Sequence, residues 1–162
     1  MSGQKGRLNT MAAVFGLQLA VAGLLLVLVL VDVIGGLRFR PLLGDEWAAV
    51  QFVTGGSKLG FAVLLAVAAF GLRRGSRIAY GLSLAGLGVA LLGVSLSVFG
   101  FGSTYQSFSF FSYANDSGGS AEQFVSWMSL SGTVSGVAGL LALILATAAF
   151  GLLVAGRAAV AR

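Results

Sequence analysis

Side chains able to perform acid–base, nucleophilic or metal chemistry are scarce in this sequence. It contains no histidine and no cysteine, and its acidic residues number five. A Ser-His-Asp triad, a cysteine nucleophile, a histidine-bound haem and the usual zinc sites are therefore excluded. The phosphate-binding pattern GxxxxGKS/T is absent as well. We expect no catalytic residue, no metal site and no cofactor, and hence a protein that is not an enzyme.

Asp32 and Lys58 are the ionisable residues that lie beside or within long apolar stretches. Asp32 directly follows residues 11–31, which contain no charge, and Lys58 lies inside residues 52–72. Charges at membrane depth are costly, so such residues usually pair with one another or mark a path for ions or protons. One interpretation is an ion pair that ties the two segments together, or a lysine whose stem carries its ammonium group to the surface. The other is a part in transport or proton movement.

Composition predicts a membrane protein rather than a soluble domain. Of the 162 residues, 57% are hydrophobic and 9% are charged, whereas soluble domains have about 45–50% apolar and about 25% charged residues. A membrane-spanning helix needs about 20 apolar residues. The predicted fold class is an all-α integral membrane protein, a four-transmembrane antiparallel helical bundle in a single domain of residues 1–162. Its helices are predicted at about 11–31, 52–72, 78–99 and 124–154, its outer loops at about 32–51 and 100–123, and its cytoplasmic turn at 73–77.

The basic residues predict the orientation of the chain. Arg38 and Arg40 lie in a predicted outer loop, where Asp45 and Glu46 offset them. Seven of the ten basic residues lie on the other side, which the positive-inside rule places in the cytoplasm together with both termini. Anionic lipid headgroups account for the net charge of +5 without nucleic acid. Arginine outnumbers lysine eight to two, which suits a GC-rich genome and a bacterial cytoplasmic membrane. The seven are Lys5, Arg7, Arg73, Arg74, Arg77, Arg157 and Arg162.

Small residues recur at helical spacing inside the predicted spans. Helices in a bilayer approach one another closely through such residues, and a GxxxG pattern is typical of a close-packed face. These faces either hold the helices of one chain together or bind another subunit, and both alternatives stay open. The predicted packing residues are Gly56 and Gly60, Gly86 and Gly93, and Gly132, Gly136 and Gly139.

An aromatic segment precedes the fourth predicted span and enters it. Nine aromatic residues, interleaved with serine, lie between residues 99 and 127. Contiguous apolar surface in a loop usually marks an interaction site. The segment either lies in the outer headgroup region or docks on a partner. The predicted partner or interface residues are Phe101, Tyr105, Phe108, Phe110, Phe111, Tyr113 and Trp127.

The predicted layout is similar to that of tetraspan families such as the claudin and MARVEL proteins. Claudins carry a tryptophan, a Gly-Leu-Trp motif and paired cysteines in a long first outer loop, whereas this chain has Trp47 alone there and no cysteine. The likeness is one of architecture only, and no family follows from it.

The absence of catalytic groups, together with the small-residue faces and the aromatic segment, predicts a non-catalytic structural or accessory subunit. Such a subunit would act as a scaffold of a larger membrane protein assembly. Its partners would be the lipid bilayer and other integral membrane subunits or further copies of itself, and not nucleic acid. The alternative is a small oligomeric transporter or channel, in which Asp32, Lys58 and hydroxyl groups of the third and fourth spans line a path.

Overall fold

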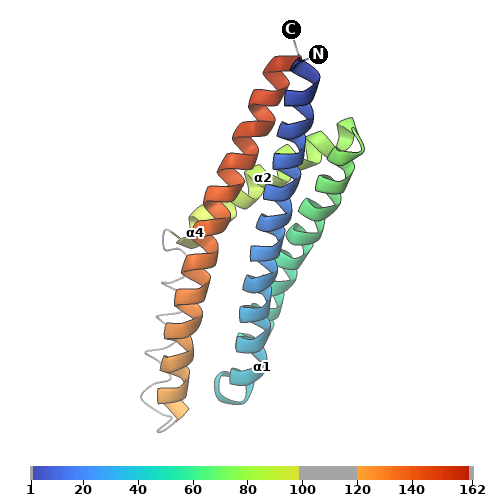
Figure 1. Ribbon diagram of the computed structural model, residues 1–162. Helices are drawn as coiled ribbons and strands as arrows, with labels where there is room; N and C mark the ends of the chain where they lie inside the picture. The colour runs from blue at the N-terminus through green and yellow to red at the C-terminus, as the bar shows by residue number, and fades with distance from the viewer. Residues whose placement is uncertain (1, 99–119, 161–162) are drawn as a thin grey trace.

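The computed structural model describes the backbone of residues 2–98 and 120–160, which is helical apart from a bend at Gly44 and a turn at residues 74–76 (Figure 1). Three helices follow one another: α1 (Ser2–Arg73), α2 (Arg77–Val98) and α4 (Ser120–Val160). Each packs against the other two. The first turn of α1 and the last turn of α4 lie at the same end of the molecule (Figure 1).

Helix α1 is 72 residues long and folds back on itself at Gly44 (Figure 1). Gly44 has φ 84° and ψ 176°, a backbone conformation that favours glycine because a Cβ would clash. Pro41, which lacks the N–H that a helix interior needs, lies three residues earlier. The bend divides α1 into a first limb, residues 2–43, and a second limb, residues 45–73. The two limbs run side by side in opposite directions (Figure 1).

The predicted four-transmembrane bundle is wrong. The described residues form three helices, and two of them contain segments long and apolar enough to cross a membrane. These segments are Thr10–Arg73 in α1 and Gln123–Gly156 in α4. The apolar part of α2, Arg77–Gly93, is shorter. Length and composition therefore support two candidate spans and not four.

The error arose in the first half of the chain. The helices predicted at 11–31 and 52–72, and the outer loop predicted between them at 32–51, are all parts of α1. The loop was predicted from the charged residues of 32–51, but arginine and glutamate have good helix propensity and the backbone there is helical except at Gly44. A single glycine therefore reverses the chain where a loop of 20 residues was expected.

A tight turn at residues 74–76 joins α1 to α2. Gly75 has φ 76°, and its N–H donates to the carbonyl oxygen of Leu72 at 2.9 Å. The hydroxyl of Ser76 accepts a hydrogen bond from the N–H of Ala79 at 3.3 Å and so caps α2. The two helices then meet closely, because a Cβ added to Gly71 would lie 2.5 Å from the Cβ of Ala79. Glycine at position 71 thus permits this approach.

The main core lies between the two limbs of α1, α2 and α4. Helix α1 contributes mostly leucine and valine to this core, whereas α2 and α4 contribute mostly alanine. The buried alanines of α4 are three or four residues apart, which places them on one smooth face for close packing. They are Ala138, Ala142, Ala146 and Ala149.

The outward faces of the helices are also apolar. Large hydrophobic side chains that are more than 60% exposed include Val53, Val67, Ile78, Leu92 and Ile144. So much exposed apolar surface is unusual for a protein in water, and helices that are apolar on all sides are typical of membrane spans. These faces and the two long apolar segments favour membrane association.

Candidate functional site

Asp32 and Lys58, the two ionisable residues singled out from the sequence, lie in contact. Lys58 Nζ donates to Asp32 Oδ2 at 2.7 Å and so joins the second limb of α1 to the first. The side chain of Lys58 is 29% exposed and that of Asp32 is 12% exposed. Gly55 leaves room for the pair, because a Cβ there would lie 3.3 Å from the Cβ of Asp32. The two charges neutralise each other in an apolar setting, so the pair acts as a clasp between the limbs.

Three of the hydroxyl groups that could line a polar path have hydrogen-bond partners inside the chain. Thr133 and Thr147 each donate to the carbonyl oxygen four residues earlier, at 2.9 and 2.8 Å. Ser83 Oγ lies 3.5 Å from Gln18 Oε1, and both side chains are fully buried between α2 and the first limb of α1. Gln18 Nε2 has no hydrogen-bond partner among the residues the structure describes. The contact between these helices therefore contains one unsatisfied amide.

Some of the predicted packing glycines serve contacts within the chain. A Cβ on Gly86 would lie 2.8 Å from Leu64 Cδ2 and 3.1 Å from Leu65 Cδ2, so glycine lets α2 approach the second limb of α1. Gly139 is buried on α4. Sequence reasoning missed Gly71, whose place just before the turn could have indicated a close helix crossing.

The other predicted packing glycines face outward. Gly56 and Gly60 on the second limb, and Gly132 and Gly136 on α4, are exposed, and a Cβ on any of them would meet no atom of the described residues within 4 Å. Gly93 on α2 is open in the same way. The first limb carries a further exposed series of small residues at steps of three and four. It consists of Ala13, Gly16, Ala20 and Gly23.

The predicted aromatic interface is placed only in part. Phe101, Tyr105, Phe108, Phe110, Phe111 and Tyr113 lie outside the described residues. Trp127 lies on α4 in a second apolar cluster, in which the ring centroids of Phe39 and Phe124 are 5.1 Å apart and those of Phe39 and Trp127 are 6.0 Å apart. This cluster joins the end of the first limb to the beginning of α4. Sequence reasoning missed Phe39 because its helix was predicted to be a loop.

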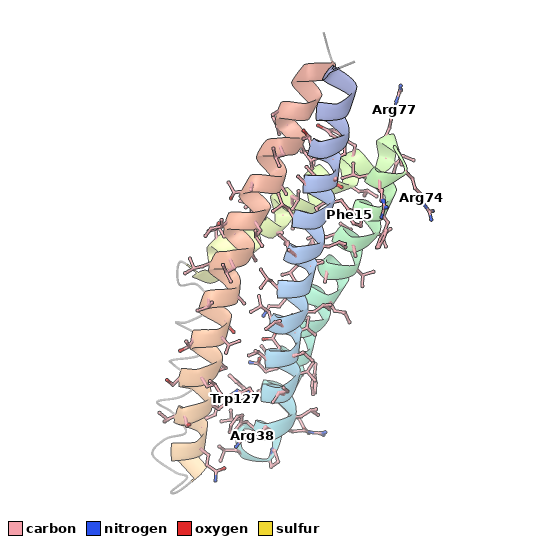
Figure 2. All side chains as sticks on the ribbon, viewed as in Figure 1. Phe15, Arg38, Arg74, Arg77 and Trp127 are labelled. Atoms are coloured by element: carbon pink, nitrogen blue, oxygen red, sulfur yellow. The ribbon has the colours of Figure 1, made fainter. Side chains whose placement is uncertain are left out.

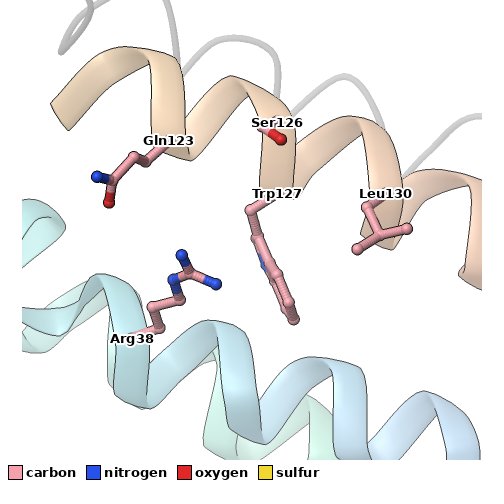
Figure 3. Close-up of a pocket in the computed structure, with 5 residues that line it drawn as sticks. All are labelled: Arg38, Gln123, Ser126, Trp127 and Leu130. Atoms are coloured by element: carbon pink, nitrogen blue, oxygen red, sulfur yellow. The ribbon is translucent and has the colours of Figure 1, made fainter. Parts of the chain in front are cut away.

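A cleft of about 280 Å³ opens beside this cluster, between the first limb of α1 and α4 (Figure 3). The guanidinium carbon of Arg38 lies 5.6 Å from the ring centroid of Phe39 and 5.9 Å from that of Trp127. Both contacts are in the range of cation–π attraction. The cleft thus contains a positive charge that two aromatic rings hold in place. Its lining consists of Arg38, Gln123, Ser126, Trp127 and Leu130.

A basic end lies far from this cleft, at the turn between α1 and α2. Arg73, Arg74 and Arg77 are exposed there, and Figure 2 shows Arg74 and Arg77 extending away from the helices. The guanidinium carbon of Arg73 lies 5.5 Å from the ring centroid of Phe15. None of these arginines forms an ion pair within the described part of the chain. Free cations at a helix end suit a surface of lipid headgroups.

Comparisons with protein-family models, with curated proteins and with solved structures find no match. Within residues 2–98 and 120–160, the described side chains form no group of three or more histidine, cysteine, aspartate or glutamate residues that could hold a metal ion. Three surface or buried features stand out instead: the clasp between the limbs, the outward glycines and the Arg38 cleft. Of these, the outward glycines are the feature that packing among the described residues leaves unexplained.

Proposed function

We propose that this protein is a non-catalytic scaffold or accessory subunit of a membrane assembly, and that it binds neighbouring membrane helices through its outward glycines. The single observation that supports this proposal is the open space at Gly56, Gly60, Gly132 and Gly136. These four residues form two GxxxG patterns, one on the second limb of α1 and one on α4. The partner is another integral membrane subunit or a second copy of this chain.

Glycine has a cost at such positions. In a helix interior it is about 1 kcal/mol less favourable than alanine. Gly86 offsets this cost by admitting the side chains of Leu64 and Leu65. The four outward glycines gain no such contact from the described residues, but a neighbouring helix could approach them backbone to backbone. A helix from outside the chain would account for their presence.

The clasp supports a structural role rather than a conducting one. An ion or proton path needs polar groups that are free to bind the moving species. Asp32 and Lys58 are bonded directly to each other, and Thr133 and Thr147 are bonded to backbone carbonyls.

We assign the bacterial cytoplasmic membrane as the location, on the excess of arginine over lysine in the chain.

The test is native purification of a tagged copy in mild detergent, followed by mass spectrometry of the accompanying proteins and by sizing. Gly60→Leu and Gly136→Leu should abolish association, because each leucine occupies the space that a neighbouring helix would need. Neither variant should unfold the chain, since each new side chain enters open space. Wild-type association in both variants, or a wild-type protein that purifies alone as a monomer, would overturn the proposal.

Two controls separate loss of association from loss of fold. Val137→Leu enlarges an exposed apolar residue next to Gly136 and should leave association unchanged. Gly86→Leu should instead destabilise the chain itself, because a Cβ at this position already lies 2.8 Å from Leu64 Cδ2. Circular dichroism of each purified variant shows which of the two effects has occurred.

A further inference from the structure

The Arg38 cleft combines a fixed cation with neutral polar groups. Its guanidinium is held against the rings of Phe39 and Trp127 but is itself exposed. A guanidinium stacked on aromatic rings keeps its N–H donors free at its edge. In Figure 3 the side chains of Arg38 and Gln123 extend into the same space, with Ser126 on the neighbouring turn of α4. Guanidinium, amide and hydroxyl groups together can donate several hydrogen bonds to one anion.

No acidic side chain within the described residues neutralises Arg38. Arg40, two residues further along, donates to Asp45 Oδ1 at 2.6 Å and is thereby paired. Arg38 forms no salt bridge with a described carboxylate. Its charge therefore faces an open cleft, whereas the charge of its neighbour does not.

The cleft also lies at a boundary between polar and apolar surface. Along α4, Gln123 and Ser126 are followed one turn later by Leu130, which is 60% exposed. On the first limb, the neighbour of Arg38 towards the molecule's apolar middle is Leu37, which is 61% exposed. A ligand that matches this surface has an anionic head and an apolar tail.

We propose that the cleft binds an anionic phospholipid, with the phosphate at Arg38, Gln123 and Ser126 and the acyl chain along Trp127 and Leu130. Arginine suits phosphate because its planar fork can donate two hydrogen bonds to two oxygens at once. The apolar wall distinguishes a lipid from a free anion, which would use only the polar half of the cleft. This proposal is independent of the glycine faces, and it concerns a bound lipid rather than a protein partner.

Quenching of Trp127 fluorescence tests the proposal directly. The chain contains two tryptophans, so a Trp47→Phe background leaves Trp127 as the single reporter. The protein is reconstituted into phosphatidylcholine bilayers that contain increasing fractions of either phosphatidylglycerol or phosphatidylcholine brominated on its acyl chains. We expect half-maximal quenching at an about fivefold lower fraction of the brominated phosphatidylglycerol, the effect of one basic side chain near the surface.

Two variants should remove this preference by different routes. Arg38→Gln removes the cation, and Gln123→Glu keeps it but adds a neutralising carboxylate to the same cleft. Both positions are exposed, so both variants should fold. Arg40→Gln is the matched control, because it removes a cation that is already paired with Asp45, and it should keep the preference. Equal quenching by the two brominated lipids, or an equal loss of preference in Arg40→Gln, would overturn the proposal.

A second arm distinguishes a lipid from free phosphate. Sodium phosphate is added to the protein in pure phosphatidylcholine bilayers, against sodium chloride at equal ionic strength. We expect the same Trp127 emission in both salts. A phosphate-dependent change that disappears in Arg38→Gln would assign the cleft to a free anion and overturn the lipid proposal.

Discussion

Removing the charge of Lys58 from the Asp32–Lys58 clasp should destabilise the chain far more than removing the charge of Asp32. Lys58→Met leaves the carboxylate of Asp32, which is 12% exposed and has a short side chain, unpaired in an apolar setting. Asp32→Asn leaves the ammonium group of Lys58, which is 29% exposed and has a long stem that can carry it towards the surface. The two variants thus differ in whether the remaining charge can escape.

The structure sets the size of each effect. For Lys58→Met we expect a loss of about 3 kcal/mol, the lower end of the range for breaking a buried pair, because neither partner is completely buried. For Asp32→Asn we expect about 1 kcal/mol, since the ammonium group regains solvent. The double variant has neither charge and should lie within about 1 kcal/mol of the wild type. The coupling energy of the pair is then about 3–5 kcal/mol, at or above the upper end of the range for two residues in contact.

Unfolding by sodium dodecyl sulfate in dodecyl maltoside micelles, followed by circular dichroism, measures these values for the four proteins of the cycle. The matched control is the equivalent cycle with Arg40→Gln and Asp45→Asn, a pair 2.6 Å apart whose side chains are 60% and 81% exposed. Its coupling should be below about 1 kcal/mol, as for other exposed pairs. A similar coupling in the two cycles, or a larger loss from Asp32→Asn than from Lys58→Met, would refute the reasoning.

Three further predictions concern helix packing. Gly71→Ala should destabilise the chain by about 1–3 kcal/mol relative to Gly60→Ala, because both gain helix propensity but only the alanine at position 71 meets a neighbour. Adding Ala79→Gly to Gly71→Ala should restore stability. A double variant that stays unstable would count against the close contact between positions 71 and 79. Gln18→Leu should leave stability unchanged or raise it by about 1 kcal/mol, because it removes a buried amide nitrogen without a described partner. A clear loss of stability in the same unfolding assay would show that this amide is satisfied. Phe39→Ala should lower the free energy of unfolding by about 3–5 kcal/mol, because the ring is buried between the first limb and α4. A red shift of tryptophan emission should accompany this loss. Unchanged stability would show that this cluster does not hold the helices together.

Several features of the candidate site could be predicted because they depend on residue type alone. A chain without histidine or cysteine excludes most catalytic and metal sites whatever its fold. Asp32 and Lys58 stood out because charges are rare beside long apolar runs, and an ion pair between them was one of two predicted roles. Arg38 and Phe39 were not predicted as part of a site, because their partners on α4 are more than 80 residues away in the sequence. Only the packing of α1 against α4 brings them together.

The sequence by itself determined that the chain is apolar, helical and poor in reactive groups, because these properties follow from composition and local propensity. The tertiary structure alone decided that residues 32–51 continue α1 and that the chain reverses at Gly44, since scattered charges are compatible with a loop and with a helix. It also decided which glycines face the core. Glycines at steps of three and four look the same in the sequence whether they meet a helix or lipid, because lipid is as apolar as leucine. Gly86 and Gly93 lie two turns apart on one face of α2, yet Gly86 is buried against Leu64 and Leu65 while Gly93 stays open, so position along the helix, rather than spacing, separates them.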